Sequence, residues 1–123
     1  MKHAIFGVGV DIVKVERFEK YVADPSCAFM QKIFTSRERE YLSGKKAQSI
    51  AGIFAAKEAV AKALGTGFAG RLPRDIEILH KQSGMPYVVL HKKKSRRRYK
   101  IHVSISHTDT DAIAYATIGN HQF

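Results

Sequence analysis

The stretch FAAKEAVAKALGTG, from Phe54 to Gly67, decides how the rest of the chain is interpreted. Alanine is the strongest helix former, and large apolar residues recur at helical spacing, so we expect a helix from about Ala47 to Leu64. These apolar residues are Ile50, Ile53, Phe54, Val60 and Leu64. Gly65 then suits the left-handed position that ends many helices.

Charged residues interrupt this alanine-rich helix. At about 100° per residue, Glu58 lies on the flank of the apolar stripe, and Lys62 lies one turn further on the same side. An acid and a base at this spacing can pair at a half-exposed edge of the helix.

The segments before this helix predict a strand and two short helices. Residues 4–13, AIFGVGVDIV, are rich in β-branched and aromatic residues and predict a strand with Asp11 at its end. Helical spacing over residues 15–23 predicts a helix. Residues 24–34 predict a second helix with Pro25 early in it.

A third short helix has clear boundaries in the sequence. Thr35 or Ser36 suits the N-cap, Glu38 follows Thr35 by three residues as in a capping box, and Gly44 lies past the end. Four strand-like runs follow later in the chain: IEIL, YVVL, KIHVSIS and AIAYATIG. Helices crowd the first half and antiparallel strands the second, which predicts an α+β fold with helices packed on an antiparallel sheet. At 123 residues we expect one domain, 1–123.

Composition limits the partners and the location. Twenty-one Lys+Arg residues against eleven Asp+Glu residues give a net charge of +10, which favours an anionic partner. The lone Cys27 cannot form an internal disulfide and favours a reducing compartment. The sequence predicts neither a signal peptide nor a membrane span, because its apolar runs are well short of about 20 residues. We therefore expect a cytoplasmic protein.

Asp11 and Glu58 are the two acids for which apolar or small neighbours are expected. One interpretation is structural, with Asp11 capping a helix and Glu58 pairing with Lys62. The other is that both carboxylates hold Mg²⁺, which proteins bind with one or two carboxylates while waters and phosphate oxygens complete the octahedron. Lys62 would then neutralise the same phosphates.

Two further motifs could contact phosphate. The GTG after Leu64 is a helix stop whose backbone N–H groups could also meet a phosphate, although it lacks the length and ending of a P-loop. His107 stands at a strand end, where a histidine is usually a structural hydrogen-bonding group but also offers a donor to phosphate. Ser106 and His107 are not a nucleophile and its base, because adjacent strand residues point to opposite faces.

The run KKKSRRRYK, residues 92–100, places seven Lys or Arg residues in nine positions between two strands, and we expect it at a hairpin tip. A solvated loop is one interpretation. An acidic partner is the next, ahead of nucleic acid, because Tyr99 is the run's only aromatic residue and base-stacking surfaces need more.

In order and spacing these motifs resemble those of the holo-acyl-carrier-protein synthases, the small bacterial type of 4′-phosphopantetheinyl transferase. The resemblance covers nearly the entire chain and rests on GVDIVKVERF, FTSRERE, FAAKEAVAKALGTG, DIEI followed by SGMPY, and SISHT. The central motif is the most specific of these. Two features depart from the family pattern: Ile53 stands where many members have arginine, and the basic run 92–100 is heavier.

The resemblance implies a 4′-phosphopantetheinyl transferase fold and a role for each acidic and basic candidate. Asp11 and Glu58 would be the Mg²⁺ ligands. Glu58 and Lys62 would be the catalytic residues, with Lys62 contacting the pyrophosphate of coenzyme A.

The remaining candidates would bind coenzyme A. Gly65, Thr66 and Gly67 would line the coenzyme pocket, and His107 would approach the 3′-phosphate of the nucleotide. Family members are homotrimers with sites between subunits, so His107 would serve a site whose Asp11 comes from another chain.

The implied reaction transfers phosphopantetheine from coenzyme A to a serine hydroxyl of apo acyl carrier protein and releases adenosine 3′,5′-bisphosphate, a step of fatty acid biosynthesis. The hydroxyl attacks the β-phosphorus while the cation and Lys62 stabilise charge on the pyrophosphate oxygens. A metal-bound water or Glu58 could take the serine proton. The alternative is a small basic nucleic-acid-binding protein, which leaves Asp11, Glu58 and His107 unexplained.

Overall fold

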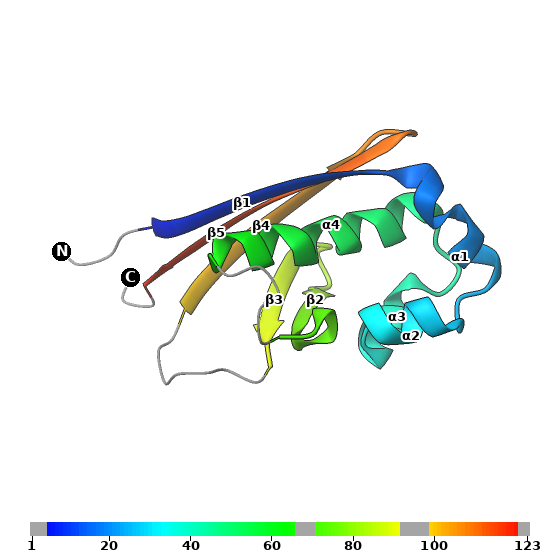
Figure 1. Cartoon of the computed structure of the whole chain (residues 1–123), viewed down its shortest axis with the longest axis horizontal. Coiled ribbons are helices and arrows are strands. Elements are labelled where there is room, and N and C mark those ends of the chain that lie inside the picture. The colour runs from blue at the N-terminus through cyan, green and yellow to red at the C-terminus, as the bar shows by residue number, and fades with distance from the viewer. Residues whose placement is uncertain (1–4, 66–70, 92–98, 121–123) are drawn as a thin grey trace.

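The computed structural model describes residues 5–65, 71–91 and 99–120. Figure 1 shows one long helix, α4, lying between a sheet on one side and shorter helices and strands on the other. The elements in chain order are β1 Ile5–Lys14, the 3₁₀ helix η1 Val15–Phe18, α1 Glu19–Ala23, α2 Ala28–Ile33, α3 Ser36–Leu42, α4 Ala47–Ala63, the 3₁₀ helix η2 Pro73–Asp75, β2 Ile76–His80, β3 Pro86–Leu90, β4 Tyr99–His107 and β5 Asp111–Asn120.

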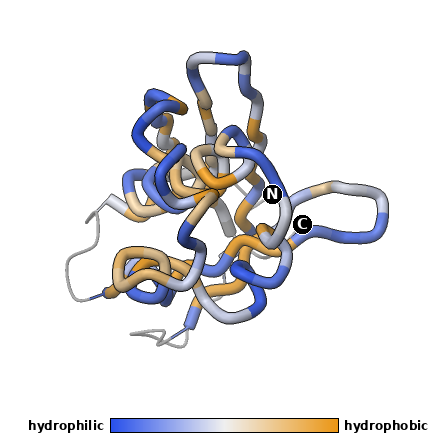
Figure 2. Tube along the Cα trace, turned by 90° about the vertical axis from the view of Figure 1, so that its right-hand side faces the viewer, coloured by the Kyte–Doolittle hydropathy of each residue, from blue (hydrophilic) through white to orange (hydrophobic). Residues whose placement is uncertain are grey.

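The helix α4 is covered on nearly all sides. Twelve of its seventeen residues are buried, including Lys57. A helix that is apolar all round is a buried helix, and alanine lets the layers above and below approach closely. Figure 2 shows that the projecting loops are mostly hydrophilic. Within the described residues, no helix is both long enough and apolar enough to cross a membrane.

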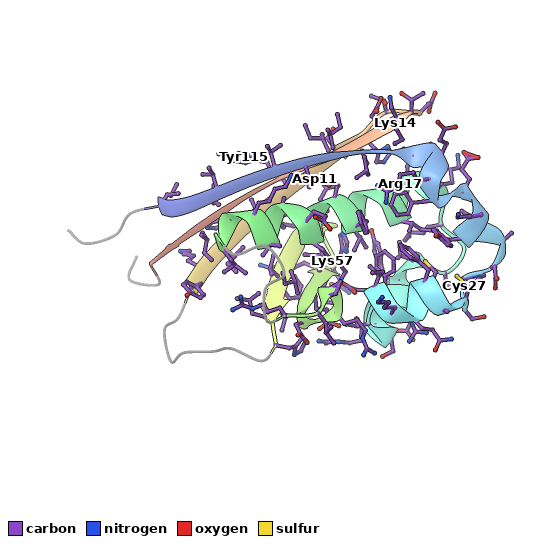
Figure 3. The ribbon with its side chains drawn as sticks, in the orientation of Figure 1. Asp11, Lys14, Arg17, Cys27, Lys57 and Tyr115 are labelled. Atoms are coloured by element: carbon purple, nitrogen blue, oxygen red, sulfur yellow. The ribbon has the colours of Figure 1, made fainter. Side chains whose placement is uncertain are left out.

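The strands form two antiparallel sheets. The first has the order β1-β5-β4, so the N-terminal strand pairs with the C-terminal one, and the second contains β2 and β3. Asp11 pairs with Ala114 of β5, which pairs with Ile105 of β4. Ala114 is buried under α4, so Asp11 faces the helix, as Figure 3 shows.

Two glycines bring β1 unusually close to α4. A Cβ atom added at Gly7 would overlap the carbonyl oxygen of Ala63, and one added at Gly9 would overlap that of Ala59. Side chains alternate along a strand, so Asp11 follows Gly9 on the same face. The glycines therefore set the short distance over which Asp11 reaches α4.

Most local predictions are confirmed. Thr35 is the N-cap of α3 and forms the expected capping box with Glu38. Gly44 and Gly65 have positive φ angles of 78° and 87°. The α+β class and the expected positions of the strands are also confirmed.

Three local expectations are wrong. β1 continues to Lys14, so Asp11 lies within the strand and caps no helix. Pro25 precedes α2, which begins at Ala28. The basic run does not join the strands of a hairpin, because β3 pairs with β2 and β4 pairs with β5; residues 92–98 of that run lie outside the described residues.

Candidate active site

Asp11 and Lys62 meet where β1 crosses the C-terminal half of α4. Lys62 Nζ donates to Asp11 Oδ1 over 3.1 Å and to the carbonyl oxygen of Val10 over 2.9 Å. The Asp11 side chain is 16% exposed and that of Lys62 is 52% exposed. One of the two interpretations of the sequence paired Lys62 with Glu58, but the lysine forms its ion pair with Asp11 on the strand.

Glu58 lies beside this pair on α4. Burial raises the pKa of the Glu58 carboxyl, and the negative charge of Asp11 raises it further, while Lys62 and Arg17 act in the opposite direction. Two carboxylates and two cations therefore share one region. Sequence reasoning had missed Arg17, whose guanidinium lies 5.3 Å from the centre of the Phe54 ring.

The acidic pair fits a hard cation. Asp11 Oδ2 is buried and has no hydrogen-bond partner among the described residues. A buried oxygen in this state is costly unless a ligand supplies positive charge or a donor. The described part of the chain contains no cluster of three or more His, Cys, Asp or Glu side chains suited to a metal. Two carboxylates match Mg²⁺, which usually keeps waters and substrate oxygens as its other ligands.

The glycine turn begins at the end of α4. Gly65 follows the helix with φ of 87°, and its N–H donates to the carbonyl oxygen of Lys62. The helix-stop role predicted for Gly65 is confirmed. Thr66 and Gly67 lie outside the described residues, so their coenzyme-binding role stays a prediction.

His107 lies at the other end of α4. It ends β4 and pairs with Ala112, which places it on the α4 side of the sheet. A pocket of about 170 Å³ opens there. It is lined by Tyr41, Gln48, Ser49, Gly52, Ile53, His80, Gly84, Pro86, Ile105 and His107. The rings of Tyr41 and His80 stack with their centres 4.0 Å apart and form a planar wall.

Basic groups flank this pocket. An adjoining hollow is lined by Lys45, Lys46 and His107, with one acidic residue, Asp109, and the uncharged residues Gly44, Gln48 and Ser49. Lys46 is the N-cap of α4, and its side chain makes no capping hydrogen bond. The N-terminus of a helix favours negative charge, so this end of α4 suits an anion. The adjacent lysines after Gly44 are the sequence signal for this basic surface, a signal absent from the predicted site residues.

The two groups of residues are separate within one chain. Asp11 is on β1 and His107 on β4, the two edge strands of the sheet, with β5 between them. Two strand spacings amount to about 10 Å. Along α4, Glu58 and Ser49 are nine residues apart, or roughly 14 Å at helical rise. One phosphate group cannot contact both sets in a single chain.

Comparison with known proteins identifies the family. Residues 7–117 match the 4′-phosphopantetheinyl transferase superfamily. A holo-[acyl-carrier-protein] synthase of Clostridium botulinum (strain Eklund 17B / Type B) is 47% identical over 121 residues, covering 93% of this chain and 97% of that protein. The corresponding protein of Clostridium perfringens (strain ATCC 13124) is 42% identical and covers 93% of each chain.

Solved structures agree with this assignment. The crystal structure of a holo-(acyl-carrier-protein) synthase from Bacillus anthracis in complex with CoA (3′,5′-ADP) has a TM-score of 0.79 and 34% identity, and the match covers 94% of this chain and 97% of that one. The Helicobacter pylori synthase in complex with coenzyme A has a TM-score of 0.79 and 33% identity, covering 90% and 98%. The chain therefore belongs to the holo-[acyl-carrier-protein] synthase family of phosphopantetheinyl transferases.

Proposed function

We propose that this enzyme transfers 4′-phosphopantetheine from coenzyme A to a serine of apo acyl carrier protein, with Mg²⁺ held by Asp11 and Glu58. The observation that carries the metal assignment is Oδ2 of Asp11, which lies beside Glu58, is buried and has no hydrogen-bond partner among residues 5–65, 71–91 and 99–120. When bound, the cation would supply positive charge to the pyrophosphate oxygens. The proposed location is the cytoplasm, where apo carrier protein and coenzyme A are expected.

The chain's own residues have distinct tasks in this reaction. The serine oxygen forms a bond to the β-phosphorus, and the bond from that phosphorus to the bridging oxygen breaks, which releases adenosine 3′,5′-bisphosphate. Lys62, which is half exposed, can turn from Asp11 toward the pyrophosphate and stabilise its growing negative charge. Glu58, which lies beside Asp11 on α4, is the group of this chain proposed to accept the serine proton.

The nucleotide of coenzyme A is assigned to the pocket at His107. The stacked rings of Tyr41 and His80 offer a flat surface to adenine. His107, Lys45 and Lys46 offer donors and positive charge to the 3′-phosphate. Ile53 forms an apolar part of the pocket wall, so the lysines replace the basic contact that many relatives have there.

A homotrimer would join the two separated groups of residues. The outer face of the three-stranded sheet exposes large apolar residues, as Figure 3 shows for Tyr115. These are Val8, Val10, Ile12, Ile113 and Tyr115, each between 41% and 63% exposed. Exposed apolar patches of this kind mark interfaces. In the proposed trimer, neighbouring copies pack through this face, and His107 of one chain serves a site whose Asp11 comes from the next.

The experiment that tests the proposal is incubation with coenzyme A, Mg²⁺ and an apo acyl carrier protein, followed by mass spectrometry of the carrier. The expected result is a mass gain equal to one phosphopantetheine, together with adenosine 3′,5′-bisphosphate in the supernatant. Treatment with a chelator should abolish the gain, and added Mg²⁺ should restore it. Transfer that persists in excess chelator would contradict the metal assignment.

A further inference from the structure

A buried ion pair lies behind the proposed site and has no part in the chemistry described above. Lys57 Nζ lies 2.8 Å from Glu38 Oε1, and the two side chains are 1% and 0% exposed. Lys57 also donates to the carbonyl oxygens of Pro73, over 3.0 Å, and Ile76, over 2.7 Å. Each of the three ammonium hydrogens therefore has an acceptor.

Glu38 is equally well bound. Its Oε1 accepts the backbone N–H of Thr35 over 2.8 Å, and its Oε2 accepts the backbone N–H of Ile78 over 2.7 Å. The ion pair and these hydrogen bonds connect α4 with α3 and with β2. Figure 3 shows Lys57 on the side of α4 opposite Asp11.

The pair is poorly explained by stability alone. Removing two charges from water offsets most of their attraction, and an apolar pair of similar volume often stabilises a core at least as well. Apolar contacts, however, have no preferred direction and allow a helix to rotate or slide slightly. Hydrogen bonds to backbone groups have preferred angles, so they fix the rotation of the helix. Neighbouring positions on a helix point about 100° apart, so a fixed Lys57 also fixes where Glu58 points.

We propose that Lys57 and Glu38 are positioning residues of the transferase. The buried pair holds α4 in the rotation at which Glu58 and Lys62 face Asp11. This inference rests on the proposed roles of those three residues, and it adds two residues that touch neither substrate nor cation.

The test uses two variants and separates positioning from stability. Lys57→Met leaves Glu38 buried without its cation and should lower thermal stability strongly. The double variant Glu38→Gln/Lys57→Met leaves no uncompensated buried charge and should recover part of that stability, because the amide still accepts one of the two backbone N–H groups. If the pair positions α4, the double variant should still lose kcat by about tenfold or more, because small misplacements of reacting groups are costly.

Cation binding supplies a readout that does not depend on turnover. Mn²⁺ bound in place of Mg²⁺ is measured by electron paramagnetic resonance. Its Kd should rise by about tenfold in the double variant, because the carboxylates are no longer aimed together.

The matched control is Met30→Ala, which removes a buried side chain from α2 and no charge. It should lose stability and keep wild-type kcat and Mn²⁺ affinity.

A double variant with wild-type kcat and Mn²⁺ affinity would overturn the inference. If the double variant does not fold, Glu38→Asp replaces it as the test variant, because this substitution keeps both charges and shortens one side chain of the ion pair. An unchanged kcat would again overturn the inference. Wild-type protein that transfers normally but binds no Mn²⁺ would overturn the metal assignment, while the kcat comparison would still decide the positioning role.

Discussion

Lys62 reaches across from α4 to bind both the carboxylate of Asp11, over 3.1 Å, and the backbone carbonyl of Val10, over 2.9 Å, on β1. The contact occupies Oδ1 of Asp11 and leaves Oδ2 buried without a partner in the described part of the chain. One oxygen is thus neutralised by the protein, and the other is available to a cation. Substitutions at this contact and around it can test both its role and its consequences.

Removing one charge from either carboxylate should nearly abolish transfer. Asp11→Asn and Glu58→Gln keep the shape of each side chain, and we expect kcat/KM to fall by about 10²-fold or more. The Mg²⁺ concentration for half-maximal rate should rise, with melting temperatures close to wild type. Initial rates over a Mg²⁺ titration measure the effect.

The matched control for these variants is Asp111→Asn. Asp111 forms a surface ion pair with Lys14 at 3.1 Å, and replacing this carboxylate by an amide should leave the rate unchanged. Wild-type turnover of either test variant at limiting Mg²⁺ would show that the acids hold no catalytic cation.

The close approach of β1 to α4 should be essential to both stability and rate. In Gly9→Ala the new methyl group would overlap the carbonyl oxygen of Ala59, so strand and helix must separate. We expect a loss of about 2–3 kcal/mol in the free energy of unfolding. Turnover should also fall, because Asp11 moves away from Lys62. Denaturant melts and steady-state rates provide the two measurements.

Gly44→Ala distinguishes this effect from a general glycine effect. Gly44 has φ of 78°, and a Cβ atom added there would meet open space, so alanine should cost about 1 kcal/mol of backbone strain. Because Gly44 also lines the hollow assigned to the 3′-phosphate, the comparison uses kcat at saturating coenzyme A, which should match wild type. If Gly9→Ala and Gly44→Ala had the same turnover, the β1–α4 spacing would have no catalytic importance.

Two inactive variants should restore one another if the sites lie between subunits. A mixed oligomer of Asp11→Asn and His107→Ala chains contains some interfaces in which both native residues are present. Activity should therefore recover to roughly a quarter of wild type or less after subunit exchange, as expected from random pairing of closed symmetric assemblies. The measurement is transfer rate against mixing ratio, with exchange verified by native mass spectrometry.

Each inactive variant incubated with itself is the control for this experiment. A monomer in solution, or no recovery after verified exchange, would contradict the shared site. Tyr115→Lys offers an independent check, because a charge on the exposed apolar face of the sheet should weaken the oligomer.

Acid should weaken the fold through Glu77. Burial pushes the pKa of the Glu77 carboxyl upward, but hydrogen bonds from Thr35, His91 and Arg37 outweigh burial and lower the pKa to about 2. An unfolded-state pKa of about 4.3 exceeds this folded-state value. The stabilisation is therefore present above about pH 4.5 and is lost as the pH falls toward 2.

Melting temperature against pH tests this prediction. Glu77→Gln should be less stable than wild type at pH 6 and should show a flatter profile between pH 5 and 3. Glu40→Gln, on the exposed side of α3, is the control and should keep the wild-type profile. An unchanged slope in Glu77→Gln would contradict the linkage.

The sequence by itself determined the local elements and proposed the residues of the candidate site. Thr35, Glu38 and Gly44 set the limits of α3 through bonds to near neighbours and a left-handed turn, so the spacing of a few residues was enough. The resemblance supplied Asp11, Glu58 and Lys62 as a set, and the structure brings these three together.

Only the tertiary structure decided which distant groups meet. Lys62 could pair with Glu58 one turn away or with Asp11 51 residues away, and the glycines of β1 brought Asp11 close enough to be its partner. The burial of Lys57 against Glu38 depends in the same way on two elements packing together. Local spacing limits what a side chain can reach along its own helix, but the packing of separate elements decides what lies opposite it.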